Sequence, residues 1–171
     1  MSKSSLEFAL EYYRFGLCPI PTYPESAKPY IHWTKYRDSN SRPSESEVER
    51  WFASWPLAGI QILLGAPSSG YFVFDFESES GYEHFIKLKK INCYLPTVKS
   101  NRGYHVYHMI NNFIAPYKTI AEIADQPLEI LGQGHLISAP PSLHRGTGKL
   151  YRWIYPLMEN IEQNEYTECL I

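Results

Sequence analysis

Apolar positions recur at helical spacing in three stretches of the chain. Between Leu6 and Tyr13 they form a wide stripe, with Ser4 or Ser5 placed to cap the helix and Gly16 placed to end it. After Pro43, the run from Ser44 to Glu47 fits a capping box and predicts a helix through about residue 55. A third helix is expected over residues 79–91, with lysines near its end, where cations complement the helix dipole.

Short apolar runs bounded by Gly, Pro and Asn predict strands between these helices. The expected strands cover residues 17–20, 59–65, 71–77, 97–100, 104–110, 128–131, 135–139 and 150–154. The tight turn at residues 67–70 favours a hairpin between the second and third of them. Repeated prolines predict irregular structure over residues 19–29, and residues 111–126 are expected to be a loop with a short helix at about 120–124.

Hairpin turns outnumber crossover connections in this pattern, which predicts an α+β domain with a mainly antiparallel sheet and flanking helices. With 171 residues, the chain is long enough for one domain with a full core. We expect that domain at residues 1–155, followed by an acidic C-terminal tail or linker at residues 156–171.

The composition excludes several classes of protein for this chain. A hydrophobic content of 44% excludes general disorder, and the net charge of −2 means that any nucleic-acid surface has to be local. The three cysteines are far apart and form no CxxC pair, which suits a reducing compartment and predicts a cytoplasmic location. No apolar run approaches the length of a membrane span, so no membrane association is expected.

The strand at residues 71–77 carries two carboxylates near its end. Because side chains alternate faces along a strand, Asp75 and Glu77 should point the same way, with the phenylalanines on the other face. Two like charges on one face repel, and a bound Mg²⁺ or Mn²⁺ would relieve that repulsion. The alternative is a strand end at which two acids simply reach water.

Basic and histidine residues follow downstream. Between Phe85 and Trp153 there are nine Lys or Arg residues against three acids, a local excess suited to phosphate contacts. The candidates for contacting a triphosphate are Lys99, Ser100, Arg102 and His105. His144 has two interpretations, a nucleotide contact or a hydrogen bond that fixes a turn.

Four features occur in order: Asp75-x-Glu77, Ser100-Asn-Arg-Gly-Tyr-His105, the lone strand acid Glu129, and Ala-Pro-Pro-Ser-Leu-His144. Here the chain resembles the archaeo-eukaryotic primase superfamily, specifically the primase-polymerase (Prim-Pol) domains of plasmid and virus replication proteins. The match covers most of the chain. The longer Ser-to-His spacing, and Glu in place of Asp at the third acid, depart from the common family pattern.

The resemblance implies an RRM-like catalytic core and template-dependent nucleotidyl transfer. By it, Asp75, Glu77 and Glu129 correspond to the metal-binding acids, and His105 corresponds to the nucleotide-contacting histidine. Mg²⁺ or Mn²⁺ is then the cofactor, NTPs or dNTPs are the substrates, and single-stranded DNA is the template. A replicative helicase on the same or another polypeptide is an expected partner.

Two other classes compete with a primase-polymerase. A metal-dependent nuclease would show similar acids but would not need triphosphate contacts. A non-catalytic nucleic-acid-binding module of the same fold would not need the acids. Glu129 alone could also be an edge-strand charge. The intact acid set argues against the binding module, and the basic and histidine groups argue against the nuclease.

Overall fold

The computed structural model describes residues 3–88 and 95–157. The predicted helix end at residues 89–91, and most of the predicted tail, lie outside these residues. The helices are α1 (Ser5–Arg14), α2 (Thr34–Asp38), α3 (Glu45–Ser54), α4 (Glu79–Leu88) and the 3₁₀ turn η1 (Ala66–Ser68). The strands are β1 (Pro19–Thr22), β2 (Gly59–Leu63), β3 (Phe72–Phe76), β4 (Thr97–Lys99), β5 (Tyr104–His108), β6 (Lys118–Ile123), β7 (Gln126–Leu131), β8 (Leu136–Ala139) and β9 (Arg152–Tyr155).

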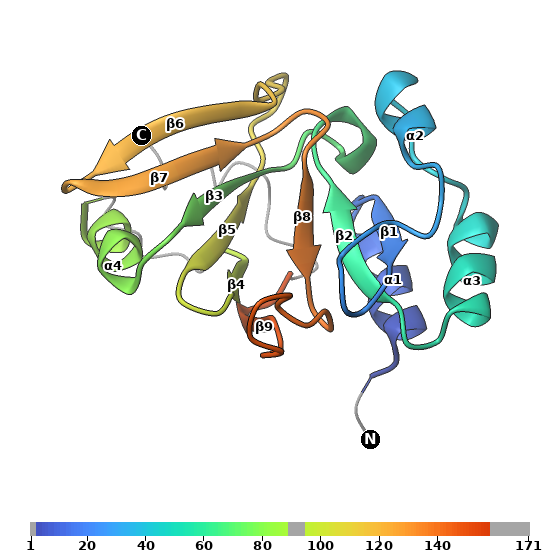
Figure 1. The fold of residues 1–171 in the computed structure, drawn as a ribbon. Coiled ribbons are helices and arrows are strands. Elements are labelled where there is room, and N and C mark those ends of the chain that lie inside the picture. Colours follow the sequence, from blue (N-terminus) through green and yellow to red (C-terminus); the bar gives the residue numbers. More distant parts are fainter. Residues whose placement is uncertain (1–2, 89–94, 158–171) are drawn as a thin grey trace.

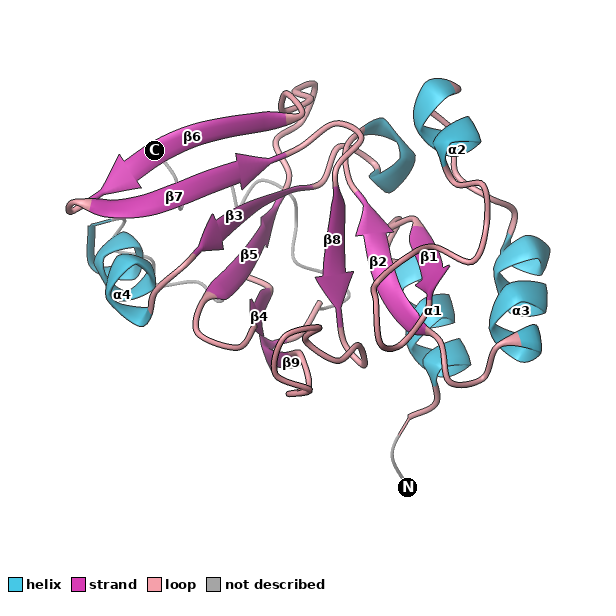
Figure 2. Cartoon of the chain, in the orientation of Figure 1, coloured by secondary structure: helices cyan, strands magenta, loops and turns pink. Residues whose placement is uncertain are grey.

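The strands form two sheets (Figure 1). The small sheet has the order β1-β2-β8 and the large sheet the order β6-β7-β3-β5-β4-β9. Every pairing between these strands is antiparallel. Helices lie at the two ends of the molecule, with α4 beside the large sheet and α1 and α3 beside the small one (Figure 2). The predicted α+β architecture with antiparallel sheets is confirmed.

The predicted capping box at Ser44 is present, and the predicted cap of the first helix, at Ser4, is a capping box as well. The Ser4 side chain accepts a hydrogen bond from the Glu7 backbone N–H, and the Glu7 carboxylate accepts one from the Ser4 backbone. Ser44 and Glu47 make the same reciprocal pair at the start of α3. Each box satisfies two backbone donors that a helix N-terminus leaves without partners, which explains why these helices begin where the sequence indicates.

The predicted hairpin between residues 59–65 and 71–77 is wrong. The two strands belong to different sheets, and only an isolated bridge joins Gly65 to Tyr71. Gly65 has φ +88°, and a Cβ there would lie 2.1 Å from Oε1 of Gln133. The chain therefore crosses between sheets at a point where only glycine fits.

Two further predictions fail for reasons of strand position. The proline-rich stretch includes β1, an edge strand, and its Pro21 carbonyl points outward to accept a hydrogen bond from Tyr30 N. An edge tolerates proline because its outer side needs no donor. Residues 118–123, expected to be partly helical, form the edge strand β6, which pairs with β7 along its whole length. A two-residue turn at Ala124 and Asp125, both with positive φ, joins β6 to β7, and this hairpin pairing overrides local propensity.

Each face of the large sheet has its own apolar core. One core lies under α4 and contains Phe76, Phe85 and Tyr104, with Phe74 packed against it. The other core joins the opposite face to the small sheet and to α1 and α3, through residues that include Val73, Tyr107 and Ile62. Along β3, phenylalanines therefore face α4, while Asp75 faces the side on which the small sheet lies. Within the described residues, no helix is long and apolar enough to cross a membrane.

Candidate active site

Strand β3 lies between β5 and β7, and this order brings the predicted site residues together. Asp75 is the direct cross-strand partner of His105 on β5 and of Glu129 on β7. Directly paired residues of an antiparallel sheet project to the same face. The three polar side chains thus form one row across three strands, although they are far apart in the sequence.

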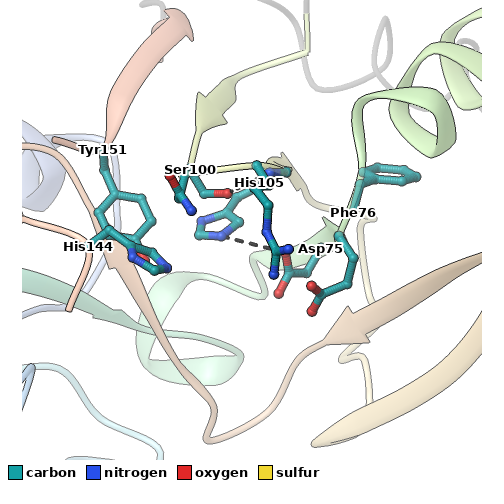
Figure 3. Close-up of a pocket in the computed structure, with 10 residues that line it drawn as sticks. Asp75, Phe76, Ser100, His105, His144 and Tyr151 are labelled. Atoms are coloured by element: carbon teal, nitrogen blue, oxygen red, sulfur yellow. Dashed lines mark hydrogen bonds and ion pairs between the residues drawn. The ribbon is translucent and has the colours of Figure 1, made fainter. Parts of the chain in front are cut away.

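A pocket opens beside this row (Figure 3). Asp75 and His105 point toward each other in it, with Tyr151 and His144 on the opposite wall, while Phe76 points away. Its lining is Asp75, Phe76, Glu77, Ser100, Asn101, Arg102, Gly103, His105, His144 and Tyr151. Six of the eight predicted site residues therefore line one pocket.

Asp75 and His105 are buried neighbours. Asp75 Oδ1 lies 3.5 Å from His105 Nε2, and the two side chains are 21% and 7% exposed. Burial, followed by repulsion from Glu77 and then from Glu129, raises the pKa of Asp75 to about 7. Burial lowers the pKa of His105 to about 4, and an interaction of the ring with the Ser138 backbone opposes this shift. The imidazole is therefore neutral at physiological pH.

The turn between β4 and β5 places polar groups over the end of β3. A Cβ on Gly103 would lie 1.7 Å from the Phe76 carbonyl oxygen, so only glycine allows this approach. Ser100 Oγ accepts a hydrogen bond from Gly103 N at 3.1 Å, and Ser100 N donates to Gly103 O at 3.0 Å. Arg102 at the tip of the turn is exposed, so its guanidinium can reach a ligand in the pocket.

His144 fixes a turn and also lines the pocket. Its Nδ1 accepts a hydrogen bond from Gly146 N at 3.3 Å and lies 3.2 Å from Thr147 Oγ1. In the neutral ring the proton is therefore on Nε2, which leaves a donor for the pocket. Tyr151 lies between the two histidines, with ring centroids 5.6 Å from His105 and 6.0 Å from His144.

Sequence reasoning did not assign Tyr151 to the site. It falls in the strand predicted at residues 150–154, and an aromatic residue on a strand is usually part of a core. The signal that identifies it is structural, because the loop between β8 and β9 returns it to the pocket wall. Asn101 also lines the pocket, but the sequence predicts only a turn at its position.

Glu129 lies outside the pocket lining and has a different partner. Its Oε1 lies 2.6 Å from Nζ of Lys118 on the neighbouring strand β6. Burial, with a further contribution from Lys118, lowers the pKa of His135, while Glu129 acts in the opposite direction. Lys118, Glu129 and His135 thus form a second polar cluster on the β7 side of Asp75. The Lys118 contact was not predicted, because residues 111–126 were expected to be a loop with a short helix.

Lys99 is not brought to the pocket. It pairs in register with Tyr104, whereas the neighbouring Val98 pairs with His105, so Lys99 projects to the opposite face. Its Nζ lies 3.7 Å from the centroid of the Tyr104 ring and 4.0 Å from a carboxylate oxygen of Glu79. This geometry places it with the α4 core.

The acids fit a cation in part. Asp75 is buried beside two other carboxyl groups, and a cation would relieve the repulsion that raises its pKa. Glu77 is exposed at the same pocket and adds oxygen ligands of the kind that Mg²⁺ and Mn²⁺ prefer. Yet within residues 3–88 and 95–157, no three His, Cys, Asp or Glu residues are arranged to hold a metal. Glu129 has to leave Lys118 before it can act as a ligand.

Comparison with known proteins identifies the family. The search of curated proteins found no match. The family model described as "Bifunctional DNA primase/polymerase, N-terminal" matches residues 9–165, which is most of the chain and includes every residue of the pocket. The chain therefore belongs to the Prim-Pol family of bifunctional DNA primases and polymerases.

Proposed function

We propose that this chain catalyses template-dependent nucleotidyl transfer, as a DNA primase and DNA polymerase, in the replication of a plasmid, virus or other mobile element. Membership of the Prim-Pol family supports a role in primer synthesis and replication. The substrates are NTPs or dNTPs on a single-stranded DNA template, with a replicative helicase on the same or another polypeptide. We place this activity in the cytoplasm, which agrees with the scattered cysteines.

The observation that carries this proposal is the row of side chains across β7, β3 and β5. Asp75 is flanked in register by an acid on one side and by a neutral histidine on the other. Acidic groups on one side of a site and hydrogen-bond donors on the other suit a substrate that carries phosphates. A surface that only bound nucleic acid would have no use for a buried carboxyl whose pKa is raised.

Asp75, Glu77 and Glu129 are the residues that would hold Mg²⁺ or Mn²⁺. A bound pair of such ions supplies charge neutralisation at the attacking and leaving oxygens of phosphoryl transfer. Asp75 contributes a buried carboxylate that must lose its proton first, since its pKa is about 7. Glu77 contributes an exposed carboxylate at the pocket mouth, and Glu129 contributes one after leaving Lys118.

Other residues of the pocket supply groups that can contact the nucleotide. Arg102 offers a planar fork of N–H groups, which matches phosphate oxygens. The ring of His105 is neutral, Nε2 of His144 offers a donor, and the Tyr151 ring lies between the two histidines. In the reaction, the primer 3′ hydroxyl loses its proton as it bonds to the α-phosphorus, and the bond to pyrophosphate breaks. Lys99 has no role in this proposal because it lies on the other face.

A primer-synthesis assay tests the proposal. Purified protein is incubated with single-stranded DNA, labelled NTPs or dNTPs, and Mg²⁺ or Mn²⁺, and extended products are counted. Wild type should make products, whereas Asp75→Asn and Glu77→Gln should make at least about 100-fold fewer. Asp125→Asn is the matched control, since that acid is exposed in the turn between β6 and β7. Cutting of end-labelled DNA without triphosphates would instead identify a nuclease.

A further inference from the structure

The loop between β8 and β9 lies in a stretch of the chain that has no acid. From Ile130 to Leu157 there is no Asp or Glu, while Arg145, Lys149 and Arg152 are present. In a chain with a net charge of −2, this absence makes the segment a local source of positive potential.

The nine Lys and Arg residues between Phe85 and Trp153 differ in their partners and in the face of the sheet on which they lie. Two of them are held by carboxylates, Lys99 near Glu79 and Lys118 against Glu129. Arg152 pairs in register with Lys99 and therefore lies on the α4 side of the sheet. Lys87 belongs to α4 itself, and two further lysines lie outside the described residues. The remaining three are Arg102, which lines the pocket, and Arg145 and Lys149 of the loop between β8 and β9.

Arg145 and Lys149 occupy a loop of defined shape, residues 143–150, which we term the β8–β9 loop. His144 N donates to Lys149 O at 2.7 Å, Gly148 N donates to His144 O at 2.8 Å, and a bridge joins Leu143 to Leu150. Both cations are exposed, and in the described part of the chain neither forms an ion pair with a carboxylate. The hydrogen bonds fix the backbone that carries these two unpaired charges. Binding a ligand through them therefore costs little loop entropy.

The loop is fixed to the rim of the pocket. His144, next to Arg145, and Tyr151, just after the loop, both line the pocket wall (Figure 3). Arg145 is close enough to Tyr151 to oppose the rise in the pKa of that hydroxyl. Asp75 lies across the pocket from this wall (Figure 3). Arg145 is therefore held at the pocket rim, and Lys149 is tied to the same wall by its backbone hydrogen bond with His144.

We infer that the β8–β9 loop binds the phosphate backbone of single-stranded DNA and so holds the strand beside the pocket. The inference rests on the proposed function, and it assigns the strand to a surface that the catalytic residues do not include. A DNA backbone is the fitting partner because its regular charges can meet two separate exposed cations, and because residues 130–157 carry no acid. The triphosphate of a nucleotide offers the same chemistry, so the experiment has to separate the two ligands.

The test is fluorescence anisotropy of a labelled single-stranded oligonucleotide, titrated with the whole chain over a range of salt. The variant is Arg145→Gln with Lys149→Gln. The matched control is Arg50→Gln with Lys87→Gln, which removes the same charge from exposed positions on α3 and α4. A parallel titration uses a fluorescent nucleoside triphosphate, and thermal unfolding checks that each variant is folded.

Each phosphate contact with a single strand adds about 0.7 to the slope of log affinity against log salt. The loop variant should lower that slope by about 1.4, which is about 25-fold weaker binding at 0.1 M salt if the curves meet at 1 M. The control should bind the strand as wild type does, and nucleotide affinity should change less than twofold in both.

Equal strand affinity in the loop variant and the control would overturn the inference. So would a loss of triphosphate binding with strand binding intact, which would assign the loop to the nucleotide. A wild-type chain that does not bind the oligonucleotide also refutes it. If the loop variant loses the strand while wild type makes no primers, the inference stands and the proposed function fails.

Discussion

Replacing Asp75 by Asn should stabilise the metal-free protein, and the gain should depend on pH. The pKa of Asp75 is about 7 in the folded chain against 3.8 in a model peptide. Between these values the folded state holds a proton that the unfolded state has lost, so stability falls as pH rises. The slope is about −1.4 kcal/mol per pH unit, and the loss is complete above the folded-state pKa.

The expected change in stability follows from the interval between the two pKa values of Asp75. From pH 5 to pH 8, ionisation of a side chain that is 21% exposed costs the wild type about 3 kcal/mol. Asparagine has the same shape and no charge, so the stability difference between Asp75→Asn and wild type should grow by that amount. His105, with its pKa lowered to about 4, adds stability as pH rises to about 6.5, but it does so in both proteins and cancels in the difference.

Urea unfolding of both proteins at pH 5, 6, 7 and 8 in EDTA measures this difference. Asp125→Asn is the control, because its side chain is exposed and its φ of +58° is a conformation that asparagine also adopts. Added Mn²⁺ should stabilise wild type at pH 8 and have little effect on Asp75→Asn. A difference that stays constant with pH, or an Asn variant less stable than wild type at pH 8, would refute the reasoning.

Three further predictions follow from the site. Lys118→Met should tighten Mn²⁺ binding in calorimetry about tenfold, because Glu129 loses the cation that competes for it; unchanged affinity beside a Lys35→Met control would contradict this. Arg102→Gln should raise the apparent KM for nucleotides about tenfold and leave oligonucleotide affinity unchanged, and the reverse pattern would place Arg102 on the strand. Gly103→Ala should lower the free energy of unfolding by roughly 2 kcal/mol or more, because the alanine Cβ meets the Phe76 carbonyl oxygen. A melting temperature within about 2 °C of wild type would show that the turn can move.

Local patterns in the sequence predicted the parts of the fold that depend on near neighbours. The capping box at Ser44 was predictable because its two partners lie three residues apart in the sequence. Strand alternation correctly separated the phenylalanines of β3 from Asp75. The direct pairing of Asp75 with His105 places β5 beside β3 and brings the histidine next to the acid.

Features that depend on distant pairing were not readable in this way. The hairpin prediction failed because a tight turn shows a change of direction but not which sheet receives the next strand. The face on which Lys99 lies depends on the register of β4 against β5, which alternation within three residues does not fix. The partner of Glu129 lies on β6, a strand whose exposed edge position leaves little apolar pattern to detect.

The order of strands in the small sheet has a consequence for how the chain folds. Strand β2 pairs with β8, Ile60 opposite Ala139, so five strands of the large sheet are made between two neighbours of the small one. Trp153 Nε1 then donates to the Tyr12 hydroxyl at 2.9 Å and joins the two ends of the chain. During synthesis, β1 and β2 must wait with one side of β2 unpaired until β8 has emerged, which predicts slow folding of high contact order. A nascent chain that stops after β7 would have Asp75 and His105 but neither His144 nor Tyr151, so the pocket is completed only when the last strands dock.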